Sequence, residues 1–171
     1  MRQNKKLFLG NRQKKMVFFL FKFFLIFFSL QFLAVLLDFS FLENTLASWE
    51  GNWAQIPVFE NRLLVFGTFF VVNAQCTGIV SSIILAAVIF SFNKPGLGKK
   101  TVWWLVGTMA LFALNLVRLF LVLWVAKTHG LYWAEIAHQV SWFSTAVFIL
   151  LIWLSLAPKM AGVKNLQELA E

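Results

Sequence analysis

The sequence contains a single cysteine, Cys76, and this scarcity removes two common uses of the residue. One thiol cannot close a disulfide bond within the chain, and it cannot form a metal site built from several cysteines. We expect neither a metal nor an organic cofactor. The remaining uses of Cys76 are a bridge to another chain, an inert buried thiol or a reactive thiol.

Charged residues are also scarce, at 13% of the chain, whereas apolar residues make up 60%. A soluble domain usually carries about 25% charged residues, so lipid is the expected solvent of much of this chain. Four apolar stretches have about the 20 residues needed to cross a hydrocarbon core of about 30 Å. They are 16–37, 76–92, 101–125 and 135–157. The sequence therefore predicts an all-α membrane protein, a bundle of about four transmembrane helices that forms a single domain over 16–157.

Acidic residues are outnumbered by basic ones, seven to fifteen, and most basic residues lie on one side of the predicted spans. Six precede the first span in 1–15, three lie in the connection 93–100, and two follow the fourth span in 158–171. The positive-inside rule makes that side cytoplasmic, so both termini are expected there, close to anionic lipid headgroups. We expect a multi-pass plasma membrane protein that has no nucleic-acid partner and keeps its first span.

The connection 38–61 is the longest, and it lies on the outer side in this topology. Apolar residues at helical spacing predict a short interfacial helix that ends at Pro57. These residues are Leu46, Trp49, Trp53 and Ile56. The next stretch, 62–73, is rich in Val and Phe around Gly67, which favours an extended or hairpin-like segment on the outer face. The alternative is fusion with the next span into one tilted helix of about 30 residues.

Three polar side chains from three different spans are expected in the outer half of the membrane. Cys76 begins the second span, Arg118 lies about seven residues or ~10 Å below the end of the third, and His138 lies in the first turn of the fourth. A helix N-terminus and a nearby cation favour the thiolate of a cysteine. Histidine can take and return protons, and arginine is retained at membrane depth where it meets an anion. This combination predicts a nucleophilic site.

Two further residues are placed to support this trio. Asn115 lies one helical turn before Arg118, where it can orient a carbonyl group or the guanidinium. Glu135 precedes His138 by one turn and can orient the imidazole. Each polar residue also has a structural use on its own. The alternative function is therefore a non-catalytic membrane assembly or scaffold protein whose polar residues serve helix packing.

Three short stretches resemble the motif regions of the exosortase/archaeosortase family. They are NAQCTGI at 73–79, NLVRL at 115–119 and WAEIAHQVSWF at 133–143. The family has a Cys-small-Gly motif, which Cys76, Thr77 and Gly78 match, followed by an Asn-x-x-Arg motif and a downstream His or Arg. Thr77 stands where many members have serine. This chain departs from the larger members in having about four expected spans instead of seven or eight.

The resemblance implies a membrane-embedded cysteine transpeptidase or protease whose site opens to the outside or periplasm. Such enzymes recognise exported proteins by a C-terminal sorting signal, which consists of a short motif, a transmembrane helix and a basic cluster. They cleave near the motif and pass the new C-terminus to an acceptor, often a lipid. By position, Cys76 is the expected nucleophile, Arg118 the charge stabiliser and His138 the acid/base.

Overall fold

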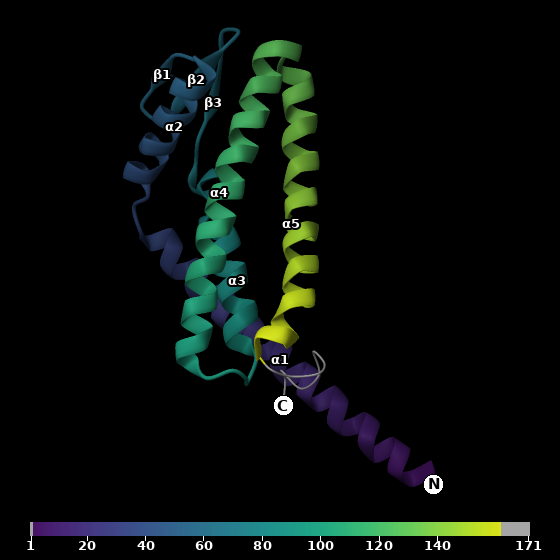
Figure 1. Ribbon diagram of the computed structural model, residues 1–171. Helices are drawn as coiled ribbons and strands as arrows, with labels where there is room; N and C mark the ends of the chain where they lie inside the picture. The colour runs from purple at the N-terminus through teal and green to yellow at the C-terminus, as the bar shows by residue number, and fades with distance from the viewer. Residues whose placement is uncertain (1, 162–171) are drawn as a thin grey trace.

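The computed structural model describes residues 2–161 and is mostly helical (Figure 1). Four long or apolar helices form what we call the bundle: α1 (Arg2–Leu36), α3 (Ile79–Ser91), α4 (Leu97–His129) and α5 (Leu131–Ala161). The other elements gather beside one half of α4 and form what we call the cap: α2 (Ser40–Ala54), β1 (Val58–Phe59), β2 (Arg62–Val65), β3 (Thr68–Val71) and the 3₁₀ helix η1 (Ala74–Thr77). Residues 162–171 of the expected cytoplasmic tail lie outside the described residues.

Among the described residues, two helical segments are long and apolar enough to cross a membrane, Gln13–Leu36 within α1 and Leu97–His129, which is α4. Their apolar 18-residue windows have mean hydropathies of 2.3 and 2.2. The expected second span is shorter than the sequence suggested, because α3 begins only at Ile79 and has 13 residues. A helix of that length measures about 20 Å, which is less than a hydrocarbon core of about 30 Å. The expected fourth span falls within α5, which has 31 residues.

The short helix predicted in the connection 38–61 is present as α2, but it ends earlier than Pro57. It stops at Ala54, because Gln55 adopts the left-handed conformation with φ of 54° and its N–H caps the last turn. The face that packs inward is made mainly of small residues, whereas Trp49 and Trp53 are exposed. Gly51 lies on the inward face, where its lack of a side chain lets Val58 and the Ile56 carbonyl lie directly against the helix.

The stretch 62–73 is extended, as expected, and the alternative of one long fused helix is wrong. β2 and β3 form an antiparallel hairpin in which Arg62 pairs with Val71 and Val65 with Thr68. The two residues between the strands, Phe66 and Gly67, both have positive φ, at 50° and 79°, which is the backbone of the tight turns that favour hairpins. β1 adds a third strand on the side of β2, which the sequence analysis did not anticipate.

The main core of the described residues lies in the cap and the half of α4 beside it. Its most buried members include Leu46 from α2, Leu63 from β2, and Leu123 and Ala126 from α4. A smaller buried cluster joins α3 to α4 through Leu85, Ile89 and Leu111. The cap is therefore held to the bundle by apolar packing on α4.

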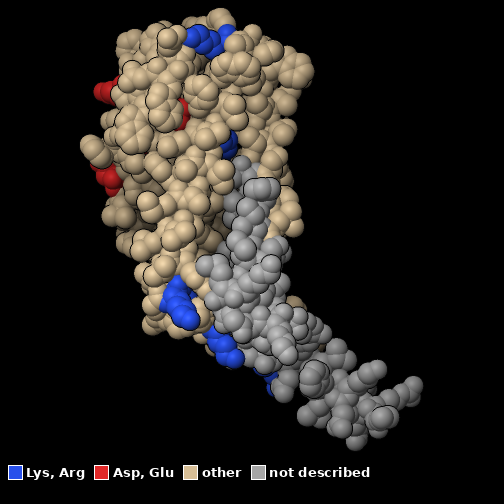
Figure 2. All heavy atoms as spheres, viewed as in Figure 1, with Lys and Arg blue, Asp and Glu red and all other residues tan. Residues whose placement is uncertain are grey.

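A single residue, Gly130 with φ of 91°, joins α4 to α5 and makes them an antiparallel hairpin. Two expected depths change as a result. Arg118 lies eleven residues, or ~16 Å, before the end of α4, and His138 is the eighth residue of α5 instead of lying in its first turn. Figure 2 shows that the visible acidic side chains lie over the cap half, where some Lys and Arg side chains also lie, and that further Lys and Arg lie toward the opposite end of the bundle.

Candidate active site

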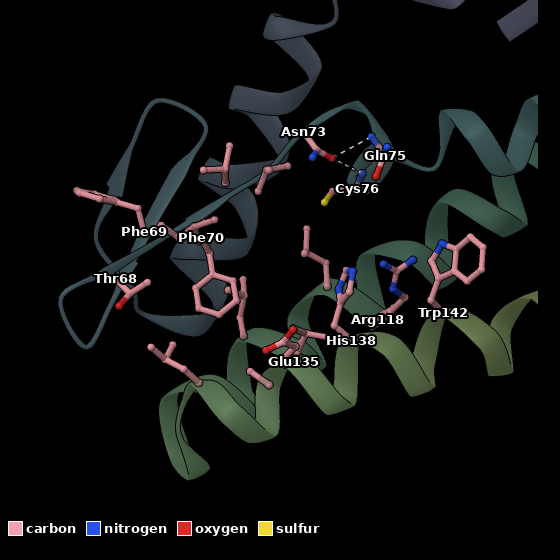
Figure 3. A pocket seen from close by; sticks show the side chains of 18 residues that line it. Thr68, Phe69, Phe70, Asn73, Gln75, Cys76, Arg118, Glu135, His138 and Trp142 are labelled. Atoms are coloured by element: carbon pink, nitrogen blue, oxygen red, sulfur yellow. Dashed lines mark hydrogen bonds between the residues drawn. The ribbon is translucent and has the colours of Figure 1, made fainter.

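One cavity of about 430 Å³ lies between the cap and the α4–α5 hairpin (Figure 3). Its walls come from β3 and η1 on one side and from α4 and α5 on the other. Cys76, Arg118, Glu135 and His138 all line it. Four of the residues singled out from the sequence therefore meet in one space, although they come from three separate elements. The volume is typical of a small-molecule or peptide site.

Cys76 lies in η1, before the start of α3, and its backbone is already engaged. Its N–H donates to the Asn73 carbonyl at 2.8 Å and approaches the Asn73 side-chain Oδ1 at 3.3 Å, and the same Oδ1 accepts from the Gln75 N–H at 3.0 Å. The sequence placed Cys76 at the N-terminus of the second span, where a free backbone N–H would favour the thiolate. The N–H of Cys76 itself is not free, because Asn73 accepts it. The side chain of Asn73 instead holds the turn that presents the thiol.

Gly78 separates η1 from α3, and its backbone requires glycine. Its φ is 82°, in the left-handed region that other residues adopt only with strain. Space is not the reason, since an added Cβ would lie 3.7 Å from the nearest atom of Asn115, an ordinary contact distance. Thr77 is buried beside it, and its hydroxyl donates to the Ala74 carbonyl at 2.6 Å. Thr77 and Gly78 therefore shape the turn and do not line the cavity.

Asn115 is the bridge between the cysteine turn and the arginine. Its side-chain Nδ2 donates to the backbone carbonyl of Cys76, and its Oδ1 accepts a hydrogen bond from Arg118 Nη1 at 3.3 Å. The residue is buried on α4, where an unpaired amide would be costly. Asn115 therefore contacts both kinds of group expected for it, and both belong to the protein: the Arg118 guanidinium and the Cys76 carbonyl.

Arg118 is half-buried in α4 and interacts electrostatically with Cys76 and with His138. In Figure 3 the guanidinium and the imidazole extend from α4 and α5 toward the side of the cavity that holds the Cys76 sulfur. One nitrogen of the guanidinium donates to Asn115. A fixed positive charge thus lines the same cavity as a thiol and an imidazole.

Glu135 lines the cavity one turn before His138, but no hydrogen bond joins the two side chains among the described residues. Its expected role in orienting the imidazole is therefore not seen. The second histidine, His129, does not line this cavity. Its Nδ1 lies 2.6 Å from the Thr128 hydroxyl, and its ring centroid lies 6.0 Å from that of Trp124 in a tilted arrangement. Among the described residues, no group of three or more His, Cys, Asp or Glu side chains could hold a metal ion.

Asn73, Trp142 and the residues of β3 also line the cavity, although they were not predicted from the sequence as site residues. Asn73 was visible as a polar residue just before the cysteine turn, and the preference of Asn for capping positions is a signal that predicts its role. Trp142 was not singled out from the sequence as a site residue, yet it lines the cavity. Because Gly130 centres the hairpin, Trp142 on α5 lies level with Arg118 on α4. The residues of β3 that line the cavity carried no sequence signal beyond their extended pattern.

Comparisons of this chain with protein-family models, with curated proteins and with solved structures found no match.

Proposed function

We propose that this protein is a membrane-embedded cysteine transpeptidase or peptidase that acts on exported proteins. The observation that carries the proposal is the shared cavity of Cys76, Arg118 and His138. These three groups supply a nucleophile, a fixed cation and a proton carrier, which are the parts that acyl transfer from a peptide requires. The resemblance of the three motif regions to those of the exosortase/archaeosortase family supports the same reaction class.

In the proposed reaction the thiolate of Cys76 attacks a peptide carbonyl carbon. The negative charge that develops on the carbonyl oxygen is stabilised by Arg118, which Asn115 holds in place. The carbon–nitrogen bond then breaks, His138 gives a proton to the departing amine, and the acyl group remains on Cys76 as a thioester. An acceptor, an amine or hydroxyl in transfer or water in hydrolysis, attacks the thioester and releases the thiolate.

The proposed setting is the plasma membrane, which α1, α4 and α5 cross and through which α3 returns the chain to the inner side, with the cap and the cavity on the outer side. The exported substrate would carry a C-terminal motif, a transmembrane helix and a basic cluster, so that its helix approaches the bundle from the lipid. The charge distribution of the sequence supports this topology, because residues 1–15, which include the start of α1, and residues 93–100, which include the start of α4, are basic.

A processing experiment in the native cell tests the proposal. C-terminal peptides of membrane and secreted proteins are quantified by mass spectrometry in cells with the wild-type chain and with Cys76→Ala. We expect at least one exported protein to keep its C-terminal helix in the Cys76→Ala cells. The two histidines provide a matched pair, since His138→Gln should reproduce the defect and His129→Gln should not. Full processing in the Cys76→Ala strain would refute the enzyme and favour the scaffold function.

Transfer and hydrolysis are separated by the chemistry of the product. A mass increase on the new C-terminus, corresponding to a lipid or another acceptor, identifies a transpeptidase. A free carboxylate identifies a protease.

A further inference from the structure

β3 is the edge strand of the sheet, and half of its backbone groups point away from β2. The sheet order is β1–β2–β3, so β3 has a neighbouring strand on one side only. The Val72 N–H donates to the Asn61 carbonyl at 2.8 Å, whereas the Leu64 N–H donates to the Pro57 carbonyl toward β1. Since backbone groups alternate sides along an antiparallel strand, those of Phe69 and Val71 face the free edge.

This free edge borders the candidate active site. Phe69, Phe70 and Val71 line the same cavity as Cys76, and the opposite wall includes Leu131 and Ala134 of α5. Figure 3 shows β3 running alongside the cavity toward the turn that carries Asn73 and Cys76. No further strand or helix of the described residues pairs with β3 along this edge.

Open edges are usually protected by a lysine, a proline or a bulge, because they are templates for pairing with another chain. The β3 sequence, TFFV, has neither a charge nor a proline, and its four residues pair with β2 in unbroken register. The edge of β3 beside the cavity can therefore form backbone hydrogen bonds with another extended chain.

We propose that β3 binds the substrate as an added strand. The occupant is an extended polypeptide segment on the N-terminal side of the bond that Cys76 attacks. An extended peptide presents N–H and C=O groups along one side at every second residue, which matches the outward groups of Phe69 and Val71. This inference rests on the proposed function, because it gives that reaction its means of placing a peptide carbonyl at Cys76.

The strand direction follows from the same topology. A substrate whose body is outside and whose helix is in the membrane enters past the β2–β3 turn and continues beyond Cys76, so it runs parallel to β3. In a parallel pair, the N–H of one peptide residue reaches the Phe69 carbonyl, and the carbonyl of that same residue accepts from the Val71 N–H. Alternate peptide amides are therefore bound, and those between them are not.

The test uses the lone cysteine as a tether. A pool of six-residue peptides with randomised side chains, each ending in a cysteamine disulfide, is equilibrated with the detergent-solubilised full chain in a thiol buffer. Any adduct forms on Cys76, because the chain has no other thiol. Enriched peptides are then resynthesised with a methyl group on each amide nitrogen in turn. Methylation of alternate amides should lower the fraction of Cys76 in the mixed disulfide by about threefold to tenfold, as expected for one lost hydrogen bond.

A pair of protein variants checks the same contact from the other side. Val71→Pro removes the outward N–H, a change that edge strands tolerate, whereas Val71→Ala shortens the side chain and keeps the N–H. Val71→Pro should weaken tethering by about threefold to tenfold, and Val71→Ala should retain most of it. The methylated peptides give the same information without altering the protein, so poor folding of Val71→Pro would not block the test.

Two results would overturn the inference: equal effects of methylation at every amide, or no peptide enriched over cysteamine alone. Either result leaves the proposed chemistry intact if Cys76→Ala still abolishes processing in cells. Conversely, suppose that methylation of alternate amides weakens tethering but Cys76→Ala cells still process fully. Peptide binding along β3 would then be supported, and the proposed reaction would be refuted.

Discussion

The cap and helix α1 place the same kinds of side chain in opposite surroundings. In the cap and the α4 residues beneath it, Leu46, Leu63 and Leu123 are at most 1% exposed. On α1, Phe28 and Phe32 are 62% and 68% exposed, although they lie in its strongly apolar part, Gln13–Leu36. The cap thus buries its apolar groups against protein, whereas α1 leaves many of its apolar groups exposed.

The candidate active site lies where the cap meets the α4–α5 hairpin of the bundle. Cys76 comes from the cap, and Arg118 and His138 come from the bundle. Two polar contacts reinforce the junction: Asn115 of α4 donates to the Cys76 carbonyl, and Lys127 of α4 donates to the Ala54 carbonyl at the end of α2 at 2.9 Å. The distance between thiol and cation therefore depends on how firmly the cap docks on α4.

The difference between the cap and α1 is tested most strongly by replacing one leucine in each of them with alanine. Leu63→Ala should lower the free energy of unfolding by about 2–5 kcal/mol, because the side chain is fully buried and leaves a cavity. Leu25→Ala on α1, where the side chain is 57% exposed, should cost far less in detergent. Thermal unfolding of the purified chain measures both. Equal losses would mean that the cap has no core of its own.

A second difference concerns Glu50, the one acidic residue in the buried face of α2. Its side chain is 0% exposed, and neither carboxyl oxygen has a hydrogen-bond partner. Burial raises its pKa to about 7. The neutral form is therefore favoured in the folded cap, and the cost of holding the carboxylate there grows as pH rises from about 4.5 to about 7.

Glu50→Gln removes this titration and should stabilise the chain above pH 7 by about 3 kcal/mol relative to the wild type. Near pH 4.5 the two should differ little, since the wild-type carboxyl is then neutral in the folded state. Unfolding temperatures measured between pH 5 and 8.5 give the comparison, with Glu60→Gln as a control at an exposed position. A constant difference across that range would show that Glu50 does not titrate with a raised pKa.

Much of the helical layout followed from the sequence, because lipid imposes a simple length rule on apolar runs. α1 and α4 were predicted within a few residues over their apolar parts, and the hairpin at 62–73 followed from its Val and Phe content around Gly67. The ends of α2 and α3 were missed because they depend on left-handed residues, Gln55 and Gly78. Gln55 is not a glycine, so the local sequence does not predict its left-handed conformation.

The lining of the site was predicted better than its geometry. The sequence indicated that Cys76, Arg118 and His138 share one level, and they do line one cavity. It did not indicate that Asn115 contacts the Cys76 backbone, since such a contact depends on how the cap docks on α4. The prediction that Glu135 orients His138 was based only on helical spacing, which places two residues on one face but does not make them bond.

Two glycines give a third comparison, with opposite expected signs. At Gly51 in the cap, an added Cβ would overlap Val58 Cγ2 and lie 3.1 Å from the Ile56 carbonyl oxygen, so Gly51→Ala should destabilise by about 1–3 kcal/mol. At Gly98 in the first turn of α4, nothing lies within 4 Å of an added Cβ. Gly98→Ala should therefore stabilise by up to about 1 kcal/mol through helix propensity. Thermal unfolding decides, and a stable Gly51→Ala would show that β1 is free to move.

The smallest expected effect lies at the junction itself. Asn73→Ala removes the side-chain acceptor for the Gln75 and Cys76 N–H groups, a loss of about 1 kcal/mol for a capping residue. Asn73→Asp keeps an acceptor oxygen and should behave like the wild type. Because η1 is held by Asn115 as well, the loss should appear as local opening of the turn, with little change in the unfolding temperature.

The rate of iodoacetamide labelling at Cys76, measured under native conditions, detects such local opening. If the turn that holds the thiol is a separate, weaker unit between two stable regions, Asn73→Ala should change the labelling rate severalfold while Asn73→Asp leaves it unaltered. If the turn opens only when the cap unfolds, labelling and unfolding temperature should change together in every variant. In that case Cys76 would belong to the cap core, and the difference between cap and bundle would extend to the edge of the cavity.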